Sequence, residues 1–479
     1  MSDPLALVPY ALAASGGTID GLPARDLVTA GLTLLRRAPA LPRALAGRRA
    51  AILLPPGPAF VTALAASEGR GAVLLNTTGA PLEFEEQLTD AEVGAVFTSA
   101  ALADRLPARV VRVLLDDAPR SARVLEFDHA RDVSLLGDTP LPLVGDPDVD
   151  GRDEEAVVVY TAAMMGRALG AILTHRNLLA NARGTIIAAA LTADDHTLAM
   201  LPFAHLFGTT VAALAPMLAG GRVSTLARFH PVRAVEQVED EGITVLVGVP
   251  ALYAAMLAAL ERRGRVLRAP ALRLCICGGA PLGAALQERW AEATGVELRQ
   301  GYGLTEAAPV CLFNRVGLPN HRGTLGVPFP GVEVSIRHPE HGGPMPPRVE
   351  GEICVRGDNV SPGYVRGGDF GLPRRDGWLH TGDRGVINAD GTVTFRGLLK
   401  PVIAHDGFNI YPREIERVLA AMPGVERARV RALPHATRGH DIGVEVWGDV
   451  SADDVRRWCS QRLALYKQPR TIIVRDPVS

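Results

Sequence analysis

Residues 157–178 read Val-Val-Val-Tyr-Thr-Ala-Ala-Met-Met-Gly-Arg-Ala-Leu-Gly-Ala-Ile-Leu-Thr-His-Arg-Asn-Leu. A short apolar run at 157–160 leads through a loop with two glycines into a helix expected near Asn177. Apolar runs that alternate with Ala-rich helical segments indicate α/β layers built on parallel or mixed sheets. The same alternation predicts strands at 50–54, 94–98 and 110–115 and a helix at 59–66.

From about Gly323 the sequence pattern changes: short segments typical of β-strands are separated by turns that contain Gly and Pro. A helix is expected at 413–422, and an αβ module follows it to the end. The chain is therefore predicted to have a large N-terminal domain of αβ-layered sheets plus a β-rich subdomain, residues 1–398, and a small, mobile α+β C-terminal domain, residues 399–479. The expected β segments of the subdomain are 324–334, 351–356 and 392–395.

Composition excludes several classes of function. The 479 residues include 50 basic and 52 acidic ones, so no nucleic-acid or anionic-membrane partner is expected. The five cysteines show no disulfide or zinc spacing, and Cys275 and Cys277 lie in an apolar run that reads as a buried strand. Free cysteines, and the lack of a basic residue before Arg25, predict a cytoplasmic protein. The oligomeric state stays open.

Residues 160–178 resemble the nucleotide loop of the adenylate-forming superfamily, which includes acyl-CoA synthetases, luciferases and peptide-synthetase adenylation domains. The pattern of that loop is YTSGTTGxPKGVxLTHxNL. The ends of the pattern are present as Tyr160, Thr161, Gly166, Gly170, Thr174, His175, Asn177 and Leu178.

The middle of this loop has lost the groups that bind a triphosphate. Such a loop needs glycines for close approach, hydroxyl donors and a cation. Thr161 and Arg167 leave a weak phosphate site open. Two interpretations remain: neutral drift in a loop redundant for ATP binding, or a protein that no longer handles ATP. The replaced positions are Ala162, Ala163, Met164 and Met165 for Ser-Gly-Thr-Thr, and Leu169 for the lysine.

Further motifs of the superfamily follow in the expected order. The run 201–208 resembles the motif whose histidine lies beside the acyl pocket, and 278–282 resembles the turn that packs on adenine. In 301–306 the resemblance implies a tyrosine stacked on adenine, a threonine on the α-phosphate and a glutamate, Glu306, that helps to hold magnesium. In 378–383 it implies an aspartate on the ribose hydroxyls. The predicted residues are His205 and Thr305 as catalytic; Gly278, Gly279, Ala280, Tyr302, Gly303, Thr305 and Asp383 for AMP; and His205, Gly208 and Gly301 for the acyl pocket.

The hinge between the domains also departs from the family pattern. Leu398 replaces an arginine, and Pro401 replaces the aspartate about which the C-terminal domain rotates between an adenylating and a thioester-forming pose. Proline restricts this rotation, which predicts a protein at rest in the thioester-forming pose. The loop beyond the hinge resembles the one that lines the pantetheine tunnel, which implies CoA contacts for His405, Gly407 and Phe408. The family's C-terminal lysine segment is also expected to be absent.

These losses predict an enzyme that has lost one half-reaction. It resembles non-adenylating acyl-CoA ligases of platensimycin-type diterpenoid biosynthesis, and it is expected to transfer the acyl group of a preformed acyl-AMP to CoA, releasing AMP. A separate adenylating enzyme is the implied partner, and ATP, magnesium or any other metal is not expected. The alternatives are a catalytically inactive acyl-adenylate-binding partner and a conventional ATP-dependent ligase. The acyl substrate, and the choice between CoA and a carrier-protein thiol, stay open.

Overall fold

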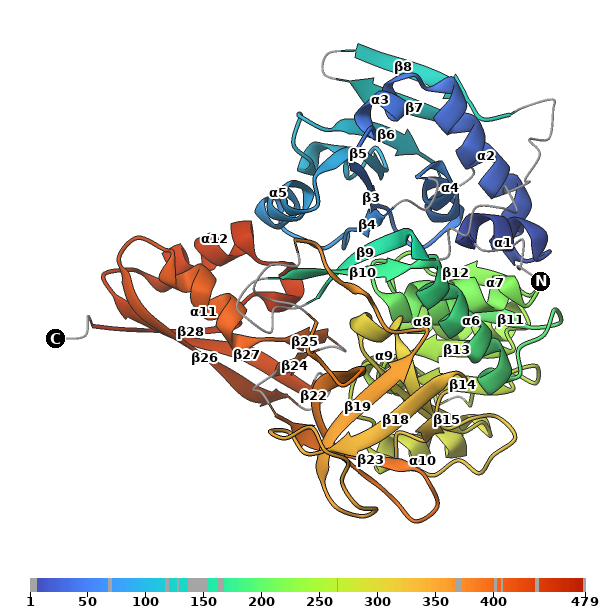
Figure 1. Ribbon diagram of the computed structural model, residues 1–479, viewed down its shortest axis with the longest axis vertical. Helices are drawn as coiled ribbons and strands as arrows, with labels where there is room; N and C mark the ends of the chain where they lie inside the picture. The colour runs from blue at the N-terminus through green and yellow to red at the C-terminus, as the bar shows by residue number, and fades with distance from the viewer. Residues whose placement is uncertain are drawn as a thin grey trace.

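The computed structural model confirms the predicted fold class, with a large layered N-terminal part and a small α+β C-terminal domain (Figure 1). It describes residues 7–67, 71–116, 120–126, 129–136, 153–161, 168–264, 266–366, 372–399, 403–405, 408–435 and 439–476.

The first sheet has a parallel centre, and helices cover both of its faces. Alternate residues of its central strands enter two separate cores, as strand geometry requires. On one face lie α8 (Pro231–Asp240), α9 (Pro250–Arg262) and α10 (Ala284–Thr294); on the other lie α6 (His175–Ala189), η3 (Phe207–Leu214) and α7 (Ala215–Leu218). Across the sheet the described strands are β17 (Val327–Pro328), β16 (Val310–Phe313), β15 (Leu298–Gly303), β14 (Leu274–Cys277), β13 (Val245–Gly248), β11 (His196–Ala199), β12 (Arg222–Thr225), β1 (Thr18–Ile19) and β2 (Leu22–Pro23).

A second sheet packs against the same central helix layer. Helices α1 (Val8–Ala14), α2 (Ala24–Arg37) and α4 (Pro58–Ala66) share the large core with α6, and α5 (Pro81–Asp90) covers the outer face. The two sheets and three helix layers give an αβαβα stack. The described strands are β20 (Gly363–Tyr364), β10 (Leu169–Thr174), β9 (Glu155–Thr161), β4 (Ala72–Leu74), β3 (Arg49–Leu53), β5 (Val93–Thr98), β6 (Val111–Leu115), β7 (Ser121–Glu126) and β8 (His129–Ser134), with the short helices α3 (Ala40–Ala44) and η1 (Ala103–Arg105) beside them.

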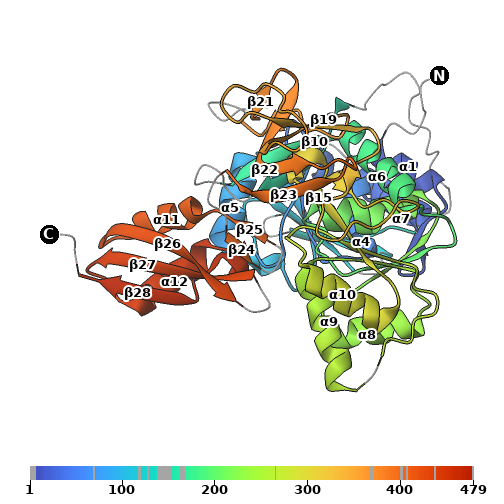
Figure 2. The same cartoon turned by 90° about the horizontal axis from the view of Figure 1, so that it is seen from below.

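The β-rich subdomain and the C-terminal domain each have a sheet of their own. The C-terminal domain buries a separate apolar cluster that begins at Ile403, and it projects from the rest of the molecule (Figure 2). The predicted boundary at 398/399 falls at the end of β23. The subdomain sheet has β18 (Val332–Arg337), β19 (Gly351–Gly357), β22 (Trp378–Ile387), β21 (Arg374–Arg375) and β23 (Val393–Leu398); the C-terminal domain has β25 (Phe408–Ile410), β24 (Ile403–His405), β27 (Gly439–Gly448), β26 (Val425–His435), β28 (Thr471–Arg475), α11 (Pro412–Ala420) and α12 (Ala452–Arg462).

In the stretch quoted first, residues 157–161 belong to β9, 169–174 to β10 and 175–178 to the start of α6. Strands β9 and β10 pair antiparallel, and a capping box begins the helix. The Thr174 hydroxyl accepts from the Asn177 amide at 3.2 Å, and the Asn177 side-chain oxygen accepts from the Thr174 amide at 2.8 Å. The Asn177 side-chain amide also donates to the carbonyl of Asp358 at 2.7 Å. Asn177 therefore helps to cap the start of the helix and also joins it to the β-rich subdomain.

Candidate active site

A cleft of about 1520 Å³, open to solvent, lies where the first sheet, the β-rich subdomain and the C-terminal domain meet. Three motif regions contribute to its walls: the turn after β14, the end of β15, and the first half of β22. Tyr411, just beyond β25, closes it from the C-terminal domain. The structure therefore brings most of the residues predicted for AMP together: Gly279, Ala280, Tyr302, Gly303 and Asp383 line this cleft.

Glycines allow the backbone to approach closely on two sides of this cleft. Gly279 has a φ of 77°, which favours glycine. A Cβ on Gly303 would overlap the backbone of Pro309, so the β15 turn cannot carry a side chain there. Gly278 and Gly301 line the neighbouring apolar cavity as well. Such bare backbone is suited to a flat base, and the predicted AMP roles of these residues stay predictions.

Asp383 and Tyr302 are paired across the cleft. The Tyr302 hydroxyl donates to a carboxylate oxygen of Asp383 at 2.6 Å. Burial raises the pKa of Asp383 to about 6; the bond from Tyr302 opposes the rise, whereas the Glu352 and Glu306 charges add to it. The Asp383 carboxylate is therefore ionised and acceptor-only at neutral pH, which suits the two hydroxyls of a ribose.

We expect nucleoside binding to weaken as the pH falls below about 6. The pKa of Asp383 is raised, so its carboxylate is ionised above that pH and becomes protonated below it, losing an acceptor for the ribose. Calorimetric titration with adenosine between about pH 5 and pH 8 measures this. Adenosine is used in place of AMP because the AMP phosphate itself titrates near pH 6 and would add its own pH dependence. An affinity that stays constant through this range would argue against a ribose on Asp383.

The turn that carries Asp383 is held by a buried carboxylate. One oxygen of Glu352 accepts from the Gly382 amide at 2.8 Å, and the other lies 2.6 Å from Nδ1 of His380. Thr381 donates its hydroxyl to the Ile353 carbonyl at 2.7 Å. Glu352, Cys354 and His380 have ligand atoms within 4.8 Å of one another, but both Glu352 oxygens are already used in these contacts. The arrangement fixes the position of Asp383.

Replacing Glu352 with glutamine is expected to weaken adenosine binding about 5–10-fold, although Glu352 does not line the cleft. The charged acceptor for Gly382 and His380 is lost, which costs about 1 to 1.5 kcal/mol. The same titration on Glu352→Gln checks it. Glu333→Gln is the matched control, since Glu333 pairs with Arg356 on the exposed side of the same sheet. Equal affinities of the two variants would contradict the prediction.

Glu306 and Thr305 occupy the short helix η4 (Thr305–Ala307). Glu306 lines the cleft and accepts from the Tyr364 hydroxyl at 2.8 Å, and burial raises the pKa of its carboxyl group. Thr305 lies between two lining residues, Leu304 and Glu306, and is itself not among them. Magnesium prefers ionised carboxylates beside substrate phosphates. The carboxylates of Glu306 and Asp383 both line the cleft, and each accepts one tyrosine hydroxyl. The expected absence of magnesium stays a prediction.

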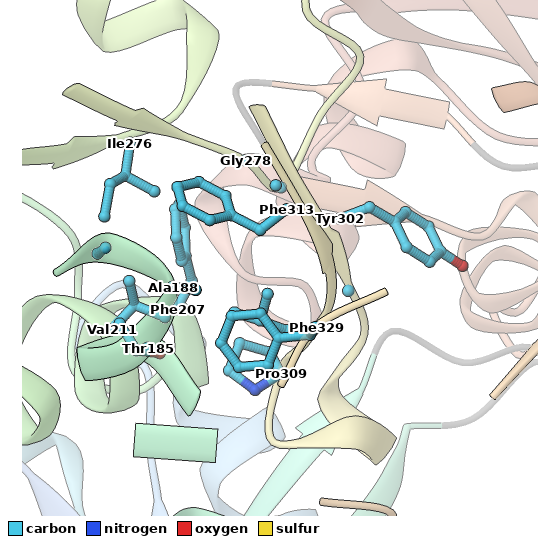
Figure 3. A pocket seen from close by; sticks show the side chains of 15 residues that line it. Thr185, Ala188, Phe207, Val211, Ile276, Gly278, Tyr302, Pro309, Phe313 and Phe329 are labelled. Carbon is cyan, nitrogen blue, oxygen red and sulfur yellow. The ribbon is translucent and has the colours of Figure 1, made fainter. Parts of the chain in front are cut away.

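An apolar cavity adjoins the cleft and shares Gly279, Gly301, Tyr302 and Gly303 with it; its open space, including solvent at its mouth, is about 490 Å³. Figure 3 shows the remaining lining side chains around this space. Of the residues predicted for the acyl pocket, Gly301 lines the cavity, whereas His205 and Gly208 do not. A Cβ on Gly208 would overlap the Pro202 carbonyl, so this glycine serves packing. Three phenylalanines that line the cavity, Phe207, Phe313 and Phe329, were not predicted from the sequence.

His205 faces the domain interface. Its Nε2 lies 3.3 Å from the side-chain amide of Asn76. Burial, and then the charge of Lys467, lower the pKa of His205 to about 4, so the ring is neutral at pH 7. The ammonium of Lys467 lies 3.1 Å from Glu83 and 2.7 Å from Glu414. The predicted catalytic role of His205 stays a prediction.

The structure describes one replaced residue of the phosphate loop, Leu169, and one of the hinge, Leu398. Leu169 is 7% exposed, within the large core, and its carbonyl accepts from the Thr161 hydroxyl at 3.4 Å. Leu398 pairs with Asp383 across β22 and β23 and lines the cleft. The other loop positions, Ala162, Ala163, Met164 and Met165, lie outside the described residues, as does Pro401.

Two of the residues predicted for CoA, His405 and Phe408, lie in strands β24 and β25 of the C-terminal domain. His405 is buried, and its Nδ1 lies 2.6 Å from the His440 carbonyl, so the ring packs within its own domain. Gly407 lies outside the described residues, and Phe408 is described by its backbone in β25. Tyr411, three residues further, lines the cleft and was missed by the sequence analysis; its position directly before a helix-starting proline was the available signal.

Bare backbone suited to a base, an ionised carboxylate and an apolar cavity adjoin one another in this region. The chain belongs to the AMP-binding enzyme family, whose model matches residues 39–365. It is an enzyme of the acyl-CoA ligase type within the adenylate-forming superfamily, a class that uses CoA and yields AMP.

Named relatives and solved structures agree with this family. The chain is 33% identical over 443 residues to a feruloyl-CoA synthase of Amycolatopsis sp, covering 90% of this chain and 85% of the relative. It is 28% identical over 462 residues to a long-chain-fatty-acid–CoA ligase of Bacillus subtilis, covering 88% and 81%. A malonyl-CoA ligase solved with methylmalonyl-CoA and AMP bound superposes with a TM-score of 0.79 at 28% identity over 100% of both chains. Within the part of the chain that the structure describes, no helix has the length and apolar character to cross a membrane.

Proposed function

We propose that this enzyme makes an acyl-CoA and AMP from CoA and a preformed acyl-adenylate, without adenylating the acid itself. The observation that carries the proposal is Leu169, which stands at the position of the triphosphate-binding lysine in the family pattern. Its side chain is apolar and buried in the core, so it supplies no charge to a phosphate. The four loop residues before it also lack the hydroxyl donors of the pattern.

The position of the C-terminal domain supports the same half-reaction. Tyr411 follows the loop that resembles the pantetheine-tunnel loop, and it lines the nucleotide cleft. The charges of Glu306 and Asp383, after burial, raise the pKa of its hydroxyl, which places the ring close to both carboxylates. A residue of the C-terminal domain therefore reaches the cleft, which supports the thioester-forming pose.

This half-reaction needs few catalytic side chains, because AMP is already a good leaving group. The CoA thiolate attacks the acyl carbonyl, the bond to the phosphate oxygen breaks, and AMP leaves with the electron pair. The protein contributes positioning: Asp383 holds the ribose, Tyr302 and the Gly279–Ala280 backbone hold the base, and Thr305 lies near the phosphate. No described side chain in the cleft is assigned as a base for the thiol. A separate adenylating enzyme supplies the acyl-adenylate.

The relatives favour a second candidate, a conventional ATP-dependent acyl-CoA ligase. The feruloyl-CoA synthase and the fatty-acid–CoA ligase match nearly the whole chain. In this reading Arg167 replaces the lost lysine, because it is the remaining cation within the loop sequence.

Two parallel reactions distinguish these candidates. One contains synthetic acyl-AMPs and CoA; the other contains the free acids, ATP, magnesium and CoA, and pyrophosphate release is followed beside acyl-CoA mass spectrometry. Asp383→Ala protein, purified identically, controls for host ligases. We expect acyl-CoA from acyl-AMP and background pyrophosphate from ATP. Product from ATP at a comparable rate would establish the conventional ligase, and no product from either reaction across a broad panel would indicate a non-catalytic acyl-adenylate-binding protein.

A further inference from the structure

The apolar cavity beside the cleft has flat walls. Phe207 comes from η3 and Phe313 from β16, and each ring packs against a glycine; Phe313 is the cross-strand neighbour of Gly301. A Cβ on Gly278 would lie 3.3 Å from the Phe207 ring, and a Cβ on Gly301 would lie 3.2 Å from the Phe313 ring. A methyl group at either glycine would displace the ring beside it, so both glycines help to keep the cavity open as a slot between the rings. Figure 3 shows these two rings and that of Phe329 around the space.

The residues that line this slot are unsuited to an acyl group that carries a second carboxylate, in addition to the carboxyl group joined to AMP. The described residues that line it carry no ionisable side chain except Tyr302, whose hydroxyl is turned to Asp383. A carboxylate buried there would lack a partner, and its cost would exceed that of any neutral group of similar size. Flat, apolar walls instead favour an aromatic ring, which stacks against phenylalanine faces and edges.

One polar group stands at the far end of the slot. Figure 3 places Thr185 on α6, with Ala188 and Val211 beside it, away from Tyr302 and the cleft. The Thr185 hydroxyl donates its proton to the Asn181 carbonyl at 2.9 Å. A hydroxyl oxygen retains acceptor capacity when it donates. Thr185 can therefore accept a hydrogen bond from a donor group on the end of an acyl chain.

We infer that the acyl group is that of an aromatic monocarboxylic acid with a hydroxyl donor on the far side of its ring, and that Thr185 accepts from this hydroxyl. The inference rests on the proposed function in so far as the cavity holds the acyl part of an acyl-adenylate. Small residues at the far end, Ala188 and Ala189, leave room for the ring substituent. The carbonyl end then lies at Gly301 and Gly303, where the cavity opens into the nucleotide cleft.

Non-reactive acyl-sulfamoyl adenosines test this directly, because their binding needs neither adenylation nor thioester formation. The probes carry 3-phenylpropanoyl, 3-(4-hydroxyphenyl)propanoyl and succinyl groups, and calorimetry compares each with adenosine. We expect the hydroxyphenyl probe to bind about 3–10-fold tighter than the phenyl probe, one hydrogen bond in magnitude. We expect the succinyl probe to bind at least about 30-fold more weakly than the phenyl probe. Succinyl binding within about threefold of the phenyl probe would overturn the substrate class.

Two variants of Thr185 isolate the hydrogen bond. Thr185→Val keeps the volume and removes the acceptor, so the preference for the hydroxyphenyl probe should vanish while affinity for the phenyl probe is kept. Thr185→Ser keeps the hydroxyl and should keep the preference. A preference that survives in Thr185→Val overturns the assignment of Thr185.

The ranking of the probes separates this inference from the proposed function. If the enzyme proves ATP-dependent but ranks the probes as expected, the substrate class stands and the non-adenylating proposal falls. If all three probes bind no tighter than adenosine, the cavity is not an acyl site, and the substrate class falls whatever the reaction assays show.

Discussion

Asp383→Asn is expected to weaken adenosine binding about 30–150-fold. The carboxylate accepts both ribose hydroxyls in the proposed complex, and each charge-assisted bond contributes about 1.5–3 kcal/mol, of which the amide oxygen of asparagine retains part. Calorimetric titration of adenosine at pH 7.5 measures the loss. At this pH the wild-type carboxylate is ionised, because its pKa is about 6.

A neighbouring aspartate provides the matched control for this variant. Asp390 lies in the turn between β22 and β23, exposed and paired with His321 at 3.4 Å. Asp390→Asn makes the same chemical change on the same hairpin and should leave the affinity within about twofold of wild type. A loss of affinity below about fivefold in Asp383→Asn would exclude a ribose on this carboxylate.

The sequence predicted the layered fold because its strands are continuous apolar runs. The run 94–98 became β5, 110–115 became β6, and the helix expected at 413–422 became α11. The cysteines of β14 are buried, as the apolar run around them indicated. Such runs predict strands well because a parallel sheet is covered on both faces.

Parts of the candidate site could be predicted because their residue types carry chemistry. Asp383 and Tyr302 stood in motifs with an acceptor and an aromatic ring at fixed spacing, and the structure brings them to 2.6 Å. Phe207, Phe313 and Phe329 could not be found in this way. They come from three separate elements, and a phenylalanine that lines a cavity has the same sequence pattern as one that fills a core.

His205 is a residue whose motif was found in the sequence but whose contacts could not be predicted from it. Its motif position predicts a place beside the acyl group. In the structure Phe207, not His205, lines the apolar cavity, and Nε2 of His205 lies 3.3 Å from the side-chain amide of Asn76, so its role stays a prediction. The burial of Lys467 could not be predicted from the sequence either. Its burial depends on the docking of the C-terminal domain, and long-range contacts of this kind leave no local pattern in the sequence.

Lys467 is the basis of the last prediction, since it joins the two domains. It lies in η5 (Leu465–Lys467) and is 3% exposed, between Glu83 of α5 and Glu414 of α11. Burial alone would lower the pKa of the ammonium, but Tyr466, Glu83 and Glu414 together raise it, so the side chain stays charged. Removing the cation would leave two buried carboxylates without their partner, which costs about 3–5 kcal/mol.

Lys467→Met is therefore expected to release the C-terminal domain from α5 and to reduce acyl-CoA formation from acyl-AMP at least about tenfold. Adenosine affinity should change less than about threefold, because Tyr302 and Asp383 lie in the N-terminal domain. Small-angle scattering measures the larger radius of gyration, and mass spectrometry measures the product.

Arg456→Met, on the exposed face of α12, removes a cation without a buried partner and should behave as wild type. Adding Glu83→Gln and Glu414→Gln to Lys467→Met removes the uncompensated charges and should restore the compact form. Unchanged scattering and turnover in Lys467→Met would show that the domain is held by its other contacts, such as the bond from the Leu465 amide to the Thr78 carbonyl at 3.4 Å.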